Sequence, residues 1–324
     1  MTTVSTAPAT TRVPASRRIG HDLTSASSLN DALQLADLDW GLEIHPAETL
    51  SLLTPDGFVS TSIPGKRLVM RDDTHVTLGV VGGAYQPVDN RATFSLADAV
   101  VAAGGAYLAG GYYGGGRRTF MELSIPEADV NVGGLDLVRA SVLILAGHDG
   151  ESNVVATNRL TRMVCTNGMH VTVKGIPATV SVRHTLTAHD RIAAADELMR
   201  ALVRYGKSFG AVAQELIDTP MTRNQFGVYI DGLFPRPEDD GSKRSLGLWE
   251  TRREELLKLW EFAETNALGR NTRWGAFNSV TEYLDWGSVV RTREGVSVEE
   301  QRALRQMQDA GRGLRDRALA SLTS

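Results

Sequence analysis

Residues 118–146 have the sequence RTFMELSIPEADVNVGGLDLVRASVLILA, in which two apolar runs flank a turn. The runs are Arg118–Ile125 and Leu135–Ala146, and Val132-Gly133-Gly134 lies between them. Apolar and β-branched residues bounded by glycines are typical of strands joined by a turn. The stretch therefore predicts two neighbouring β-strands.

Three more strands are expected around this pair, at Tyr107–Tyr113, Ser152–Thr166 and Thr179–His184. The glycine runs Gly114-Gly115-Gly116 and Gly147-His148-Asp149-Gly150 supply the turns between them. Short connections of this kind join antiparallel strands. The centre of the chain is therefore predicted to form an antiparallel sheet.

Segments before the sheet are mixed in character. A strand pair is expected at Lys66–Arg71 and His75–Val81, and Ser28 is positioned to cap a short helix. A further helix is expected at Arg91–Ala103, ended by Gly104-Gly105.

Segments after the sheet are predicted to be helical. Helices are expected at Asp190–Phe209, Ala211–Ile217 and Leu246–Glu264, and an amphipathic tail at 297–322 weakened by Gly311 and Gly313. The predicted class is α+β, with a central antiparallel sheet, helices packed on one face and a helical C-terminal part.

The chain divides by composition into four predicted parts. Residues 1–27 are rich in Ser, Thr and Ala and are expected to be a disordered lead-in. An α+β core is expected at 28–233, a proline-broken linker at 234–245 and a helical region at 246–324.

Charge and cysteine content exclude several classes. The formal net charge is −4, which argues against a uniformly basic nucleic-acid coat but leaves room for a local basic groove. The single cysteine, Cys165, excludes an internal disulfide and a multi-cysteine zinc site. No segment is long and apolar enough to span a bilayer. A cytoplasmic location without a membrane partner is expected.

Several short motifs occur in a fixed order along the chain. The first blocks are GAYQPVDN at 83–90, which contains Tyr85, Pro87 and Asn90, then His148-Asp149, the block from Arg162 to Asn167, and His184. A last block at 274–283 contains Trp274, Asn278, Glu282 and Tyr283. In these blocks the chain resembles the phage- and plasmid-associated family called domain of unknown function 932. The resemblance covers about residues 40 to 290.

The resemblance implies a mobile-element origin but carries no established activity. Relatives commonly have Asp-His after the last block, whereas Asp285 is followed here by Trp286. Any role of that histidine is therefore missing from this chain. In outline, strands followed by helices are also similar to phage single-strand annealing proteins, a likeness of fold only.

Basic and aromatic residues of the predicted sheet suggest a nucleic-acid surface. Guanidinium groups bind phosphates in a forked geometry, and aromatic rings stack on bases. The expected DNA-binding residues are Arg117, Arg118, Arg159, Arg162, Lys174, Arg183, Tyr112 and Tyr113. Arg159 and Arg162 differ by an odd number, so they are expected on opposite faces of one strand. Solvated sheet edges and salt bridges remain an equal alternative for these cations.

Enzymatic chemistry has weaker support in the sequence. His148, His170, His184 and His189 follow no metal-ligand spacing, so no metal and no cofactor are expected. Cys165 lies among apolar residues and is expected to be buried. The block from Trp274 to Asp285 is interpreted as a polar network that joins a helix to the sheet.

Three functions follow, in order of preference. The first is a single-stranded-DNA-binding protein that promotes annealing in homologous recombination, as a homo-oligomer with a phage exonuclease as a further partner. The second is a nucleic-acid- or nucleotide-processing enzyme that uses His148, Asp149, His184 and Glu282. The third is a phage host-interaction protein.

Overall fold

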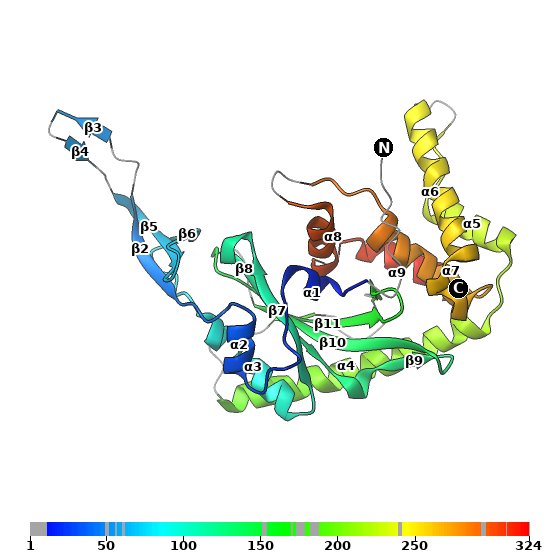
Figure 1. The fold of residues 1–324 in the computed structure, drawn as a ribbon, viewed down its shortest axis with the longest axis horizontal. Helices are drawn as coiled ribbons and strands as arrows, with labels where there is room; N and C mark the ends of the chain where they lie inside the picture. Colours follow the sequence, from blue (N-terminus) through cyan, green and yellow to red (C-terminus); the bar gives the residue numbers. More distant parts are fainter. Residues whose placement is uncertain are drawn as a thin grey trace.

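The computed structural model describes residues 12–48, 52–55, 57–59, 62–150, 154–169, 171–172, 179–181, 188–238, 242–292, 296–308 and 310–323. An antiparallel sheet of eight strands forms its centre (Figure 1). Its strands are β1 (His21–Asp22), β7 (Ala106–Tyr113), β8 (Arg118–Ser124), β9 (Val130–Val132), β10 (Asp136–Gly147), β11 (Val155–Arg162), β12 (Asn167–Gly168) and β13 (Thr179–Ser181). The order across the sheet is β1-β7-β8-β10-β11-β12, with β9 beside β10 and β13 beside β11.

Strand β10 is the centre of the sheet because it pairs with β8 on one side and β11 on the other. Its residues alternate between two buried faces, since Val142 and Ile144 join the main core while Leu143 joins a smaller cluster. The hairpin expected at 118–146 is thus a true pair of neighbours. Strand β11 is shorter than expected, because residues 163–166 form a turn in which Thr166 has a φ of 54°.

The main core lies between the sheet and the helices α2 (Leu29–Leu35), α3 (Asn90–Ala102) and α4 (Ala188–Asp218), which lie along one face in Figure 1. The Ser28 hydroxyl caps α2 by accepting a hydrogen bond from the Asp31 backbone N–H. The expected α+β class is confirmed by this arrangement.

Helices also cover the opposite face of the sheet. Helix α1 (Ala15–Ile19) and helix α8 (Val298–Met307) enclose Phe120 and Leu143 through Ala15, Ala303 and Met307. The expectation of a disordered segment up to residue 27 is therefore wrong for residues 12–27. Leu23 is completely buried and β1 pairs with β7, so tertiary contacts order a segment that composition alone classed as disordered.

A three-stranded arm projects from the body in Figure 1. It consists of β2 (Leu42–Glu48), β5 (Ser62–Arg71) and β6 (Thr77–Gly82), in the order β2-β5-β6, and the short pair β3 (Leu52–Thr54) and β4 (Gly57–Val59) forms its end. The arm meets the body at Gly79. A Cβ there would lie 2.6 Å from the Cα and carbonyl oxygen of Asp149, so only glycine allows this approach.

The C-terminal helices are α5 (Arg223–Leu233), α6 (Lys243–Phe262), α7 (Arg273–Glu282) and α9 (Arg312–Thr323). Shorter helical turns occur at Gly114–Gly116, Pro126–Ala128 and Glu264–Gly269, and a π-helical turn at Tyr283–Gly287 follows α7. Helix α6 begins inside the expected linker, because the Ser242 hydroxyl caps it at the Ser245 N–H.

Helix α4 is one continuous helix where two were expected. Gly206 and Gly210 do not interrupt it. They allow close packing instead, because a Cβ on Gly206 would collide with the carbonyl oxygen of Ala128. The break expected in the C-terminal tail is present, at Gly311 with a φ of 93°, while Gly313 continues into α9.

Candidate functional site

Arg162 is completely buried on the core face of β11 and forms an ion pair with Asp136 of β10. Its Nε lies 2.9 and 2.7 Å from the two carboxylate oxygens, and its Nη2 lies 2.6 Å from Oδ2. Trp274 of α7 donates its indole N–H to the same Oδ2 at 2.8 Å. Arg162 is thus wrong as a DNA-binding residue, because no phosphate can reach it without dismantling the core.

Arg159 lies on the other face of the sheet, as its odd spacing from Arg162 predicts. Only 6% of it is exposed, and it donates hydrogen bonds to the carbonyl oxygen of Gln306 and to the sulfur of Met307 on α8. The prediction that Arg159 lies on an open surface is therefore wrong.

Arg117 and Arg118 lie at the end of the β7–β8 hairpin. Arg118 is partly exposed and forms an ion pair with Asp149 at 2.5 Å. Arg117 is exposed, and no ion pair within the described part of the chain involves it. Lys174 and Arg183 lie outside the described residues, as does His184. Among the expected cations that lie in the described ranges, Arg159 and Arg162 are on opposite faces and only Arg117 is exposed.

The glycine-rich hairpin end forms one wall of an open cleft of about 500 Å³. Tyr112, Tyr113, Gly114 and Gly115 line this wall. The opposite side consists of Arg18, Ile19, Ser297, Glu299 and Glu300 from α1 and the start of α8. We call this hollow the tip cleft. It brings both predicted tyrosines to a surface large enough for part of a polymeric ligand.

The two tyrosines differ in how firmly they are held. The Tyr112 hydroxyl donates to Asp37 at 3.1 Å, and its ring meets Trp40 edge to face while the Arg71 guanidinium lies over it. Tyr113 packs at the margin of the smaller apolar cluster. Tyr112 is therefore a fixed part of the wall, whereas Tyr113 is partly buried at its margin.

The first motif residues connect the start of α3 with the end of β10 and with the segment before β2. Asn90 donates to the carbonyl oxygen of Leu38 and lies 2.9 Å from the imidazole of His148, which packs edge to face against Trp40. His148 and Asn90 are both nearly inaccessible. Tyr85 is half-buried, as is Pro87, and its pKa is raised by burial and then by the nearby charge of Asp149. The buried contacts of Asn90 and His148 therefore have a structural role at the start of α3 and the end of β10.

The last motif block forms a second buried network. Glu282 accepts from Arg12 at 2.5 Å and from the Thr265 hydroxyl at 2.6 Å. Asn167 meets the Thr281 hydroxyl at 3.3 Å, and Asn278 donates to the Trp274 carbonyl oxygen. This network supports the interpretation of the block as a polar connection between helix and sheet.

Two partners in this network, Asp136 and Arg315, were missed by sequence reasoning. Asp136, Asp285 and Arg315 are all buried, and Arg315 pairs with Asp285, which also accepts from the Gly168 backbone at 2.9 Å. Asp136 follows a turn and Arg315 lies in an amphipathic helix, so both resemble ordinary surface charges in the sequence. No local pattern signals such pairs.

The titratable groups of the two networks offer no acid and base in a common pocket among the described residues. His148 contacts Asn90, Asp149 pairs with Arg118, and Glu282 is enclosed by Arg12 and Thr265. Burial raises the pKa of Cys165 to about 11, so its thiol is a poor nucleophile. Within the described ranges no group of histidine, cysteine or carboxylate side chains could hold a metal ion.

The motif residues contribute to the packing of the core. The family comparison matches the segment of the chain that contains them. A family model described as Domain of unknown function (DUF932) matches residues 77–307. The chain belongs to this family. No curated protein and no solved structure matches the chain significantly. Among the described residues, no helix is long and apolar enough to cross a membrane.

In this DUF932 chain the ring of Trp286 is a stacking surface for two arginines. The guanidinium carbons of Arg12 and Arg18 lie 4.9 and 4.3 Å from its ring centroid. Trp286 thus holds the segment before β1 against the C-terminal helices.

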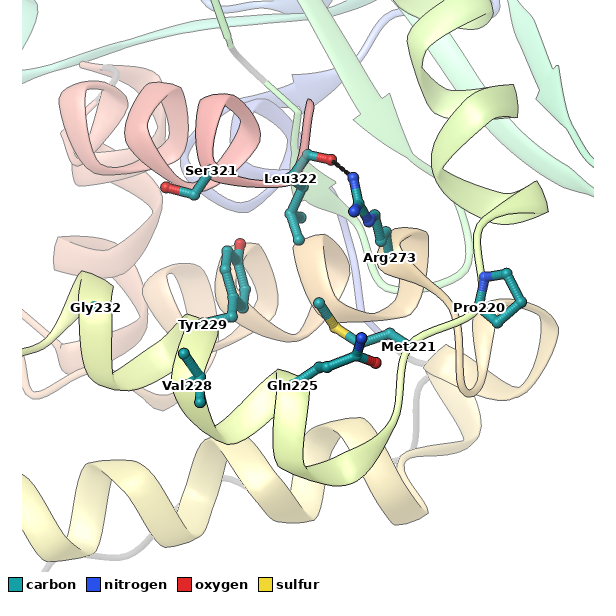
Figure 2. A pocket seen from close by; sticks show the side chains of 9 residues that line it. All are labelled: Pro220, Met221, Gln225, Val228, Tyr229, Gly232, Arg273, Ser321 and Leu322. Atoms are coloured by element: carbon teal, nitrogen blue, oxygen red, sulfur yellow. Dashed lines mark hydrogen bonds between the residues drawn. The ribbon is translucent and has the colours of Figure 1, made fainter. Parts of the chain in front are cut away.

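A second hollow, of about 360 Å³, lies between α5 and α9 (Figure 2). Met221, Val228 and Tyr229 line it, and Arg273 reaches across it to the backbone carbonyl oxygen of Leu322. This contact caps the C-terminal end of α9, which accounts for Arg273 structurally.

Proposed function

We propose that the chain binds single-stranded DNA in the tip cleft. The observation that carries the proposal is that Tyr112, Tyr113 and the glycines of the hairpin end line an open cleft, while Arg117 beside them is exposed. Aromatic rings bind bases by stacking, without regard to sequence, and arginines bind phosphates.

The roles within the cleft follow from the freedom of each side chain. Tyr113 offers a ring for stacking, and the exposed Arg117 beside the cleft offers a guanidinium group. The guanidinium of Arg18 lies against Trp286 and donates to Gln306. Glu299 and Glu300 offer carboxylate acceptors that suit the exocyclic amino groups of bases. The cleft thus has chemistry for both parts of a nucleotide.

Few cations take part, and this sets the expected salt dependence. One phosphate contact, at Arg117, gives a slope of log affinity against log salt of roughly −0.7 on a single strand. That value is much shallower than the steep dependence that the full set of predicted basic residues would give.

The experiment is a titration of fluorescein-labelled oligothymidine with the full chain, followed by fluorescence anisotropy across a salt series. The proposal expects saturable, sequence-indifferent binding with the shallow slope. Absence of binding at low salt would refute it. An annealing assay with two complementary oligonucleotides tests the expected role in homologous recombination separately.

The homo-oligomer and the exonuclease partner expected from the sequence stay predictions. Sedimentation of the chain alone and with oligothymidine measures the first of them directly.

A further inference from the structure

Helix α1 separates two hollows on the same face of the sheet. The tip cleft ends at Arg18 and Ile19 of this helix. A second, narrow hollow, with a volume of about 10 Å³ while α1 is in place, lies beneath Pro14, Ala15 and Ser16. We call the second one the covered pocket. The barrier between them is α1, whose Ala15 rests on Phe120.

We propose that the DNA-binding cleft continues beneath α1, and that Arg159 becomes a phosphate-binding residue when α1 is displaced. This inference rests on the proposed function of the tip cleft. It assigns α1 as a cover over the second half of the site.

The covered pocket has the groups that a phosphodiester needs. Arg159, Thr161 and Thr166 line it together with the backbone at Gly168. Guanidinium and hydroxyl groups are the usual donors to phosphate oxygens. Glu122, which also lines the pocket, accepts the Ser141 hydroxyl at 2.5 Å.

The attachment of α1 is mainly polar. Its only fully buried apolar residue is Ala15, and Ile19 is partly buried. A helix of five residues has no stability of its own, so α1 is helical only while its contacts hold. Its polar contacts include the ion pair of Arg12 with Glu282 and the stacking of Arg12 and Arg18 on Trp286. Arg18 also donates to Gln306 of α8, and Arg17 pairs with Asp22 of β1.

A strand of DNA can compete for these contacts. Phosphates attract guanidinium groups as carboxylates and aromatic rings do, so a polyanion in the tip cleft offers alternative partners to Arg12 and Arg18. Burial already lowers the pKa of Arg18 to about 10, which shows that its charge is poorly solvated under the cover. The ligand itself therefore favours the displaced state.

Buried polar atoms beneath α1 lack partners. Within the described ranges, the Ser16 hydroxyl oxygen and the Gln306 side-chain nitrogen make no hydrogen bond, although the two residues are only 2% and 4% exposed. Buried polar groups are normally satisfied in a permanent interface. The interface of α1 with α8 thus resembles a contact that opens.

The test compares variants that loosen α1 with one that does not. Glu282→Gln removes the charge that holds Arg12, and Trp286→Ala removes the stacking surface. Arg200→Ala is the control, because Arg200 is exposed on α4 and pairs with Asp196 of the same helix. Hydrogen exchange of residues 14–20 without DNA measures the displacement, and oligothymidine anisotropy measures binding.

Loosened variants are expected to exchange faster in α1 and to bind more tightly. If the displaced fraction rises from about one tenth to nearly all molecules, the affinity rises about tenfold. The salt slope becomes steeper by about 0.7, the contribution of one phosphate contact. Adding Arg159→Gln to Trp286→Ala should return both the affinity and the salt slope to the wild-type values.

The failures of the two proposals are distinguishable. If no variant binds oligothymidine, the proposed function fails. If the wild type binds but Trp286→Ala raises α1 exchange without raising affinity, or if Arg159→Gln leaves the gain intact, the continued cleft is refuted. Unchanged exchange in both loosened variants refutes the cover itself.

Discussion

Arg162 and Asp136 face each other between neighbouring strands β11 and β10, with neither side chain exposed to solvent. Trp274 and Asn266 complete the hydrogen bonds of the pair. Because a buried ion pair is costly to break from one side, this contact connects the strands of the sheet to the C-terminal helices.

Asp136→Asn is expected to lower the free energy of unfolding by about 3–5 kcal/mol, because it leaves the Arg162 charge uncompensated in the core. Urea unfolding followed by circular dichroism measures the loss. The double variant Asp136→Leu with Arg162→Met removes both charges and should lose less than the single variant. A loss below that of Arg117→Ala, an exposed control, would contradict the structural role.

Tyr113→Ala should weaken oligothymidine binding about 5- to 150-fold, since stacking contributes roughly 1–3 kcal/mol per base. Tyr113→Phe keeps the ring and should bind as the wild type does. Equal affinity of both variants would exclude Tyr113 as a stacking platform.

Arg117→Ala should make the salt slope shallower by about 0.7, because one phosphate contact is lost. Arg200→Ala is the matched control, since Arg200 is exposed on α4 and lies outside the tip cleft. If both substitutions change the slope equally, the effect comes from net charge alone.

Gly206→Ala is expected to destabilise the fold by about 1–3 kcal/mol, because the new methyl group collides with the Ala128 carbonyl oxygen. Gly247→Ala in α6 has open space around it and should stabilise by about 0.5–1 kcal/mol through helix propensity. Thermal unfolding of the two variants measures the contrast. Stabilisation by both would show that α4 does not approach Ala128 closely.

The free energy of unfolding should fall at alkaline pH, because the buried thiol of Cys165 resists ionisation in the folded state. Burial raises its pKa from 9.0 to about 11, so above pH 9 the unfolded state loses the thiol proton first and is favoured. The contribution of the protonated thiol to the free energy of unfolding is fully present below pH 9. It declines by about 2 kcal/mol by pH 11. Cys165→Ala should show a smaller decline than the wild type in urea unfolding between these pH values. Identical declines would mean that the thiol ionises normally.

Sequence patterns predicted the elements whose signals are local. The Ser28 cap, the helix before Gly104 and the hairpin at 118–146 depend on neighbours in the chain, and all are present. The order of α1 could not be predicted, because it depends on Trp286 and α8, which lie far along the sequence.

The candidate site was predicted in part for the same reason. Tyr112 and Tyr113 were recognisable at a glycine-rich turn and do line a cleft. Strand parity placed Arg159 and Arg162 on opposite faces, but it says nothing about depth. Whether an arginine meets water or a carboxylate depends on Asp136 and α8, whose positions only the tertiary structure provides.

The contact of Gly79 with Asp149 has a mechanical consequence for the arm. The arm meets the body where the backbones of Gly79 and Asp149 approach each other closely. A side chain at position 79 would push β6 away from Asp149 and rotate the arm about this contact. The far end of the arm would then move by more than the width of one methyl group. The direction in which the arm projects therefore depends on the glycine at position 79.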